Sequence, residues 1–218
     1  MSTDTPESRI SDFFTDPAVN PPTLGPASVL HLLRRDVNFC FGIDHKTGQP
    51  APRLGRAIFP GVMTIMAGWD LLGKFLAGSD APNQAGPRFQ EFVQRFVRTA
   101  TTATGDLTEE QVWCLWQLRN SMLHSFGLIA KAETKRYPVD IVQFVLSYGA
   151  MDVIFVGQTP GTGARLWTAV VDYWKLQQQF EQSIAAFRLE LEDTGSGGEL
   201  QIRFQRIWAD YGRTQIQP

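Results

Sequence analysis

An arginine, an asparagine and a histidine follow one another closely at Arg119, Asn120 and His124. An imidazole can take up and release protons near neutral pH, and a guanidinium can hold the charge that develops on a phosphate group. Together these groups suit the cleavage of a phosphodiester without a metal ion. The residues around them are rich in large apolar side chains, so the motif stands out from its surroundings.

The motif is predicted to lie on a helix with a clear start signal. Thr108 and Gln111 match a capping box, and the helix is expected to run to about Gly127. At 100° per residue, Asn120 and His124 share one face. Trp113 and Gln117 belong to the same face, whereas Leu115, Leu118, Met122 and Phe126 are expected to point into the core.

Arg119 lies roughly 140° around an ideal helix from His124. The two side chains therefore need help to meet one phosphate: the length of the arginine, a local bend, or a second subunit. A two-fold homodimer would bring two arginines and two histidines into one cleft.

Charged residues elsewhere could support the motif. Asp70 and Lys74 are spaced to form a surface ion pair, the favoured interpretation, or Asp70 could face the motif and orient Arg119 or His124. A small basic cluster after the motif helix could follow an RNA backbone, although three such charges are commonly just solvated. The cluster consists of Lys131, Lys135 and Arg136.

Composition limits the classes of protein that fit. The 218 residues include 43% hydrophobic residues and six tryptophans, enough for a sizeable core, and the net charge of −2 argues against tight, non-specific binding to nucleic acid. Two distant cysteines and three scattered histidines predict no disulfide framework, metal site or other cofactor. The polar N-terminus lacks a signal-peptide pattern, and the most apolar stretch, 58–76, carries Asp70 and Lys74. A cytoplasmic protein without a membrane segment is expected.

The chain is predicted to be mainly α-helical, with a poorly ordered arm over 1–25 and a single domain over 26–218. A small antiparallel β insertion, about 128–157, is expected as a hairpin of 139–147 and 152–156, with a third strand at 128–130. Residues 158–165 look like a phosphate-binding loop but lack its lysine and hydroxyl, so they are interpreted as a strand-to-helix turn. The other helices are expected at about 29–41, from 60 to 76, at 89–97, at 164–191 and at 199–211, with a loop at 42–55 and a break at 193–198.

The stretch 108–128 resembles the HEPN superfamily of helical nucleases. In that family an arginine is followed after about four to six residues by a histidine, most often with a polar residue directly after the arginine. The resemblance implies a HEPN-like helical bundle in which Arg119 and His124 are the catalytic pair and Asn120 orients them. It also implies a homodimer that cuts RNA without metal. Some members carry a tyrosine that a partner nucleotidyltransferase modifies, but here that position is Phe126.

By this resemblance, His124 would assist attack of the ribose 2′-hydroxyl on the adjacent phosphate or protonate the leaving 5′-oxygen. Arg119 would stabilise the charge on the phosphorane. The products would be a 2′,3′-cyclic phosphate and a 5′-hydroxyl, and DNA would resist because it lacks the 2′-hydroxyl. The implied biology is RNA restriction by a toxin or a defence effector, with an antitoxin or another regulatory partner as a further expectation.

The competing hypothesis is a non-catalytic helical module that dimerises or binds RNA or a nucleotide. A buried His124 with satisfied hydrogen bonds would favour the module, and a solvent-open cleft holding His124 from both subunits would favour the enzyme.

Overall fold

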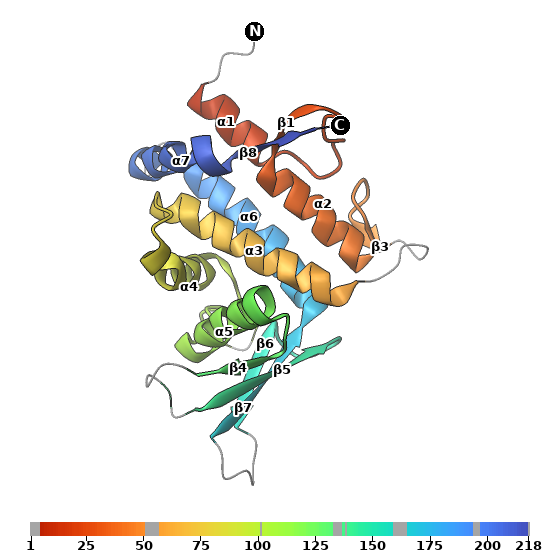
Figure 1. Ribbon diagram of the computed structural model, residues 1–218, viewed down its shortest axis with the longest axis vertical. Helices are drawn as coiled ribbons and strands as arrows, with labels where there is room; N and C mark the ends of the chain where they lie inside the picture. Colours follow the sequence, from red (N-terminus) through yellow and green to blue (C-terminus); the bar gives the residue numbers. More distant parts are fainter. Residues whose placement is uncertain are drawn as a thin grey trace.

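The computed structural model describes residues 5–50, 57–100, 102–132, 137, 139–158, 165–193 and 197–217. A helical body forms most of the molecule, and a four-stranded sheet lies at one end of it (Figure 1). The prediction of a helix-rich chain with a small sheet is therefore confirmed. The helices in the described residues are α1 (Pro6–Phe13), α2 (Val29–Phe41), α3 (Ile58–Ala77), the 3-10 helix η1 (Pro82–Gln84), α4 (Ala85–Phe96), α5 (Glu109–Ser125), α6 (Tyr173–Glu192) and α7 (Gly197–Tyr211).

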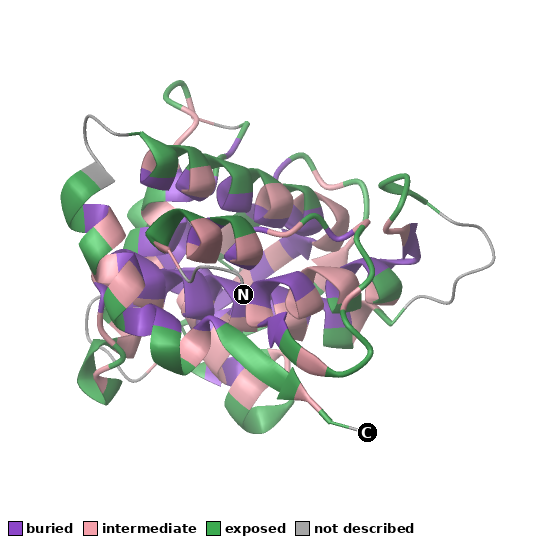
Figure 2. Ribbon diagram, turned by 90° about the horizontal axis from the view of Figure 1, so that it is seen from above, coloured by how far each residue is buried: buried purple, intermediate pink, exposed green. Residues whose placement is uncertain are grey.

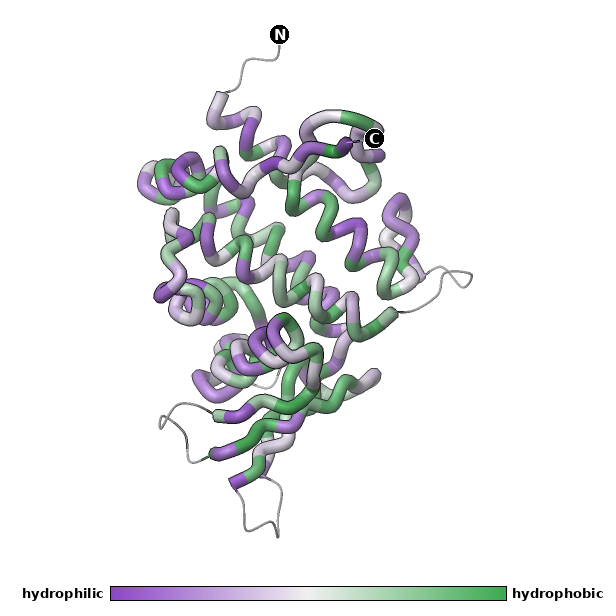
Figure 3. Tube along the Cα trace, viewed as in Figure 1, coloured by the Kyte–Doolittle hydropathy of each residue, from purple (hydrophilic) through white to green (hydrophobic). Residues whose placement is uncertain are grey.

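Helix α3 is the centre of the helical body. It contacts α2, α4, α5, α6 and α7, and hydrophobic residues run along most of its length (Figure 3). A helix that is apolar on nearly all sides is stable only when other elements cover it. A Cβ on Gly73 would lie 2.9 Å from the carbonyl oxygen of Arg88, so the absence of a side chain lets α3 and α4 approach closely.

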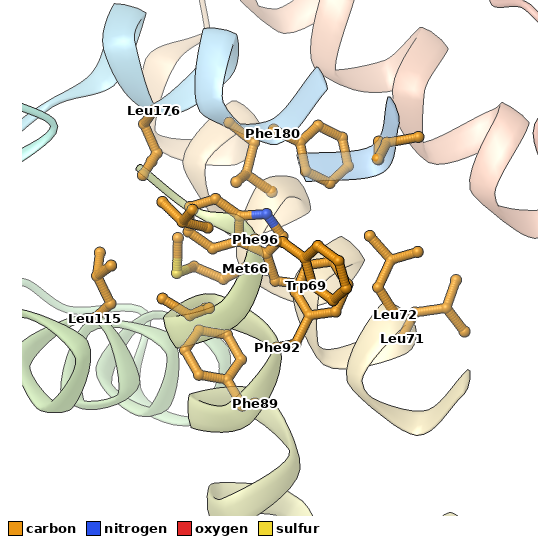
Figure 4. Close-up of a cluster of buried hydrophobic side chains, with 14 of the residues drawn as sticks. Met66, Trp69, Leu71, Leu72, Phe89, Phe92, Phe96, Leu115, Leu176 and Phe180 are labelled. Atoms are coloured by element: carbon orange, nitrogen blue, oxygen red, sulfur yellow. The ribbon is translucent and has the colours of Figure 1, made fainter. Parts of the chain in front are cut away.

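The core is rich in aromatic side chains. Four helices meet around Trp69, which donates a hydrogen bond from Nε1 to Ser183 Oγ at 3.0 Å (Figure 4). Buried residues fill the interior and exposed ones line the outer helix faces (Figure 2). The side chains around Trp69 are Met66, Leu71 and Leu72 from α3, Phe89, Phe92 and Phe96 from α4, Leu115 from α5, and Leu176 and Phe180 from α6.

The N-terminal segment packs into this core, which differs from the poorly ordered arm expected over 1–25. Thr5 and Ser8 form a capping box that starts α1. Phe13 is fully buried, with its ring centroid 4.4 Å from that of Phe75. Strand β1 (Gly25–Ser28) then pairs antiparallel with β8 (Arg213–Ile216), so the segment before α2 lies beside the C-terminal strand (Figure 1). The residues around Ile10, Phe13 and Phe14 are mostly polar, so the sequence pattern did not indicate that these three side chains form one apolar face.

Replacing Phe13 by alanine tests the role of α1. Removing a fully buried phenylalanine is expected to lower the free energy of unfolding by about 3–5 kcal/mol. Urea denaturation followed by circular dichroism measures this change. Phe39→Ala on α2 is the matched control, because Phe39 is largely exposed and its loss should change the same quantity by less than about 0.5 kcal/mol. An equally small effect at Phe13 would contradict the packing of α1.

The predicted capping box of α5 is confirmed, because Thr108 and Gln111 form it. Helix α2 begins where predicted, and Ser28 caps it by accepting a hydrogen bond from the backbone N–H of His31. Helices α3, α4 and α7 lie close to their predicted bounds. The expected loop at 42–55 contains a small hairpin of β2 (Ile43–Asp44) and β3 (Gln49–Pro50), and residues 51–56 lie outside the described residues.

The main sheet is mixed, and the predicted hairpin is wrong. Its strands are ordered β4 (Ile129–Lys131), β5 (Ile141–Ser147), β7 (Leu166–Asp172) and β6 (Ile154–Gln158). Strand β7 lies between β5 and β6, parallel to the first and antiparallel to the second. The alternation of apolar and polar residues predicts that a segment is a strand, but it does not predict which strand lies beside it. Strand pairing is decided by contacts between distant parts of the chain.

Strand β7 also corrects the helix predicted from 164 to 191. The β-branched and aromatic residues of 166–172 form a strand, and α6 begins only at Tyr173, where Asp172 caps it through the backbone N–H groups of Trp174 and Lys175. Gln158 and Arg165 therefore flank a connection between two strands, not a turn from strand to helix; residues 159–164 of that segment lie outside the described residues. The β region thus extends beyond the predicted limit at 157. Of the predicted break at 193–198, residues 194–196 also lie outside the described residues.

Candidate functional site

Helix α5 is buried on two sides. Leu115, Leu118 and Met122 face the helical body, as predicted. On another side, Trp113 packs against Trp167 of β7 with their ring centroids 6.0 Å apart. The motif residues lie beyond these contacts, towards the C-terminal end of α5 and its accessible side.

Arg119 joins the motif into one cluster. Its Nη1 lies 3.1 Å from Asn120 Oδ1 and 3.0 Å from His124 Nε2, while Nη2 donates to Asp70 Oδ2 at 3.0 Å. The length of the arginine side chain spans the separation around the helix, so the pair meets within one chain without a bend or a second subunit. The guanidinium carbon also lies 5.0 Å from the ring centroid of Trp116, in a cation–π arrangement.

Asp70 pairs with Arg119, and the favoured interpretation that it pairs with Lys74 is wrong. On α3 it faces α5, whereas Lys74 lies one turn further along, where its Nζ is 4.0 Å above the ring of Tyr211. The side chains of Arg119 and Asp70 are only 12% and 16% exposed. Reduced contact with water strengthens an ion pair relative to one on the surface, so this contact fixes the guanidinium more firmly than a surface pair would.

The Asp70–Arg119 contact uses one oxygen and one nitrogen. Asp70 Oδ1 and Arg119 Nε are both buried without a hydrogen-bond partner. The bidentate fork that arginine commonly forms with a carboxylate is therefore incomplete. Because Asp70 holds only Nη2, Nη1 remains directed towards Asn120 and His124.

His124 is exposed on the last turn of α5. A guanidinium has donors and no acceptor, so this contact is a hydrogen bond between Arg119 and His124 in the tautomer that carries its ring proton on Nδ1 and accepts at Nε2. An accepting nitrogen is what a general base requires.

The turn after α5 fixes the end of the helix. Phe126 adopts a left-handed conformation (φ 49°) and is exposed, which corrects its predicted place in the core. The buried hydroxyl of Ser121 lies 2.8 Å from the carbonyl oxygen of Gly127 and 2.9 Å from that of Ile129. Sequence reasoning passed over Ser121 and Trp116, although Trp116 stands three residues before Arg119, a spacing that places two side chains on one side of a helix.

The predicted basic cluster is only partly described. Lys131 is exposed on β4, and no hydrogen bond or ion pair joins it to the motif within the described part of the chain. Lys135 and Arg136 lie outside the described residues. The described structure therefore brings Asp70, Arg119, Asn120 and His124 together but adds no further cation to them.

Other reactive groups are placed away from the motif or are unavailable. Among the described residues, no group of three or more histidine, cysteine, aspartate or glutamate side chains could hold a metal ion. Cys114 lies inside α5, where burial raises the pKa of its thiol to about 12, so it is not a nucleophile near neutral pH. In the same part of the chain, no helix has the length and apolar character needed to span a membrane.

We expect His31 to make the stability of the fold depend on pH. It is buried, its Nδ1 lies 3.3 Å from the carbonyl oxygen of Thr15, and its Nε2 has no partner. Burial lowers the pKa of His31 below its ordinary value of about 6.5. Between the lowered pKa and that value the unfolded chain binds more protons than the folded one, so the free energy of unfolding falls as the pH drops through this window.

We expect denaturant titrations above and below about pH 6.5 to show this loss of stability in the wild type. His31→Gln removes the titrating group and should flatten the dependence in that window. A variant that loses stability with acid as steeply as the wild type would show that another group is responsible.

Comparison of the chain with protein-family models, with curated proteins and with solved structures found no match.

Proposed function

We propose that this protein is a metal-independent endoribonuclease that uses Arg119 and His124 as its catalytic pair. The observation that carries the proposal is the 3.0 Å contact between Arg119 Nη1 and the accessible His124 Nε2. An accessible proton acceptor thereby lies next to a phosphate-binding cation at one end of α5. The resemblance of this motif to that of HEPN nucleases supports the same chemistry.

In the proposed reaction, a phosphate of RNA takes the place beside Arg119 Nη1 that His124 occupies in the free protein. His124 Nε2 accepts the proton of the neighbouring 2′-hydroxyl, and the 2′-oxygen attacks phosphorus. Arg119 stabilises the negative charge of the phosphorane. The bond from phosphorus to the 5′-oxygen then breaks, and the leaving oxygen takes a proton from water. The imidazolium of His124 gives its proton to the hydroxide that is left, and a 2′,3′-cyclic phosphate remains.

Three neighbours position the guanidinium in this proposal. Asp70 holds Nη2, the ring of Trp116 lies against the guanidinium, and Asn120 accepts a hydrogen bond from Nη1. Preorganisation of this kind lowers the cost of holding the cation where charge develops. Asp70 also offsets part of the positive charge, which suits a moderate affinity for RNA and agrees with the net charge of −2.

We propose a cytoplasmic enzyme that restricts RNA, as a toxin or a defence effector held in check by an antitoxin or another regulatory partner. The small net charge favours a selective substrate over general degradation of RNA.

The test is cleavage of RNA by the purified protein in the presence of EDTA, with DNA of the same sequence as the control. RNA alone should be cut, and the products should carry 2′,3′-cyclic phosphate ends, because only the 2′-hydroxyl can form that ring. Cleavage of both nucleic acids, or activity that EDTA abolishes, would contradict the mechanism.

A second candidate is a non-catalytic helical module. The ion pair of Arg119 with Asp70 favours it, because two side chains that are 12% and 16% exposed also form a satisfactory structural contact. A protein that binds RNA without cutting it, and whose affinity survives His124→Ala, would support the module over the enzyme.

A further inference from the structure

The four-stranded sheet has one covered face and one open face. Along β5 and β7 the buried side chains alternate with more accessible ones. The covered face packs on α5, as the contact of Trp113 with Trp167 shows, and the sheet lies at the end of the molecule beyond that helix (Figure 1). We refer to the other side, formed by the outward residues of β4, β5, β6 and β7, as the outer sheet face.

An apolar row crosses the middle of the outer sheet face. Val145 of β5 lies directly opposite Val170 of β7, which lies directly opposite Phe155 of β6. Phe155 is 62% exposed and Val145 is 41% exposed. Ile129 of β4, also exposed, faces Gln143 in the next row. Side chains opposite one another on adjacent strands are in contact range, so Val145, Val170 and Phe155 form one continuous apolar row.

Exposed apolar side chains are concentrated in this part of the chain. Of the eleven large hydrophobic residues that are exposed in the described structure, six lie between 126 and 155. Three of the six, Ile129, Val145 and Phe155, lie on the outer sheet face. Single exposed apolar residues are ordinary, but a cluster of them marks an interaction surface. The six are Phe126, Ile129, Val145, Tyr148, Met151 and Phe155.

The outer sheet face is nearly free of charge. Among its described strand residues the one charged outward side chain is Lys131, at the margin on β4. Asp172 at the end of β7 is buried and caps α6, and Asp140 and Arg165 beside the strands pair with each other. A face whose one described cation lies at the margin does not suit nucleic acid. It can lie against an identical face without repulsion between like charges.

We propose that the outer sheet face binds the outer sheet face of a second copy of this chain. A two-fold axis along β7 would place Phe155 over Val145 of the partner subunit, and Val170 over Val170 of the partner subunit. The ring of Phe155 from each subunit then lies against the smaller Val145 of the other, so the same contact occurs twice, as a two-fold symmetric interface requires. Two sheets packed in this way lie about 10 Å apart.

The size of the face sets the expected strength of the dimer. Four strands about 4.8 Å apart and about five residues long give a face of only about 300 Å² in projection. Stable complexes commonly bury about 800 Å² on each partner. The dimer is therefore expected to be reversible and to depend on protein concentration.

This dimer would hold the two α5 helices on opposite sides of the paired sheets. Each Arg119–His124 pair would then act by itself, in contrast to the shared cleft that the family resemblance implies. The proposed dimer does not depend on the proposed activity. A protein that stays monomeric can still cut RNA, and a dimer can lack RNA cleavage, so the two experiments test the two proposals separately.

Sedimentation velocity over a range of concentrations tests the proposal. Wild type should shift from monomer to dimer as concentration rises, and Phe155→Asp and Val145→Lys should each stay monomeric. Leu189→Asp is the matched control, because Leu189 is an exposed apolar residue on α6, away from the sheet, and this variant should dimerise like the wild type. Circular dichroism of each variant confirms that it is folded.

A mixture of the Phe155→Asp and Val145→Lys variants tests the axis. With the axis along β7, the carboxylate introduced on β6 of one chain would meet the ammonium introduced on β5 of the other. The mixture should therefore form a dimer that neither variant forms alone. A mixture that stays monomeric would overturn this axis. A wild type that is monomeric throughout would overturn the dimer, and one that instead sediments with phosphatidylcholine vesicles would assign the face to a lipid surface.

Discussion

His124→Ala is expected to lower the rate of RNA cleavage by about 10²- to 10⁴-fold, the contribution that a positioned proton acceptor commonly makes. We expect this effect to arise from chemistry and not from a loss of folding. The imidazole is exposed, and its one described contact is to Arg119 Nη1. Loss of the ring should therefore change the free energy of unfolding by less than about 0.5 kcal/mol.

Single-turnover cleavage of a labelled RNA measures the rate, and His45→Ala is the matched control. His45 also places its Nε2 3.0 Å from an arginine, Arg35, but that pair lies at the hairpin of β2 and β3. The control should cleave like the wild type. If His124→Ala did so as well, the motif would not be the active site and any measured cleavage would belong elsewhere.

Arg119→Lys is expected to lower the cleavage rate by about 10²- to 10³-fold, although it keeps the positive charge. The guanidinium contacts Asp70 through Nη2 and reaches His124 through Nη1, whereas a lysine ammonium is a single point that cannot occupy both positions. An ammonium drawn to Asp70 leaves the place beside His124 without a donor. The loss should appear in kcat more than in KM, because the stabilised charge develops in the transition state.

The second arm of this experiment uses Asp70→Asn. The amide removes the charge of Asp70 but keeps its shape, so Arg119 loses its anchor and retains its donors. We expect a smaller loss of about tenfold, and the double variant should cleave no more slowly than Arg119→Lys alone, because Asp70 acts through Arg119. Arg188→Lys, at an exposed ion pair on α6, is the control for an arginine replaced away from the site. Independent, multiplicative losses at positions 70 and 119 would contradict this arrangement.

The local features of the candidate site could be predicted from the sequence. Thr108 and Gln111 identify the start of α5 because a capping box involves only residues three apart. The apolar spacing places Leu115, Leu118 and Met122 in the core. Even the angular gap between Arg119 and His124 follows from helix geometry, and the structure closes it within one chain through the length of the arginine side chain itself.

Contacts between distant segments required the tertiary structure. Spacing alone favours Lys74 as the partner of Asp70, and only the packing of α3 against α5 turns Asp70 to Arg119. Spacing alone also predicts a helix over 166–172, whereas the insertion of this segment between β5 and β6 makes it a strand and decides the order of the sheet. The burial of Phe13 likewise depends on Phe75 and Phe204, far along the chain.

The sequence by itself thus determined the capping box of α5, the apolar repeat along that helix, and which chemical groups stand near one another on it. The tertiary structure alone decided which strand lies beside which, which acid holds the arginine, and which sheet face remains open. The reason is physical: capping and periodicity arise from neighbours along the chain, whereas pairing and burial depend on segments that folding brings together from far apart.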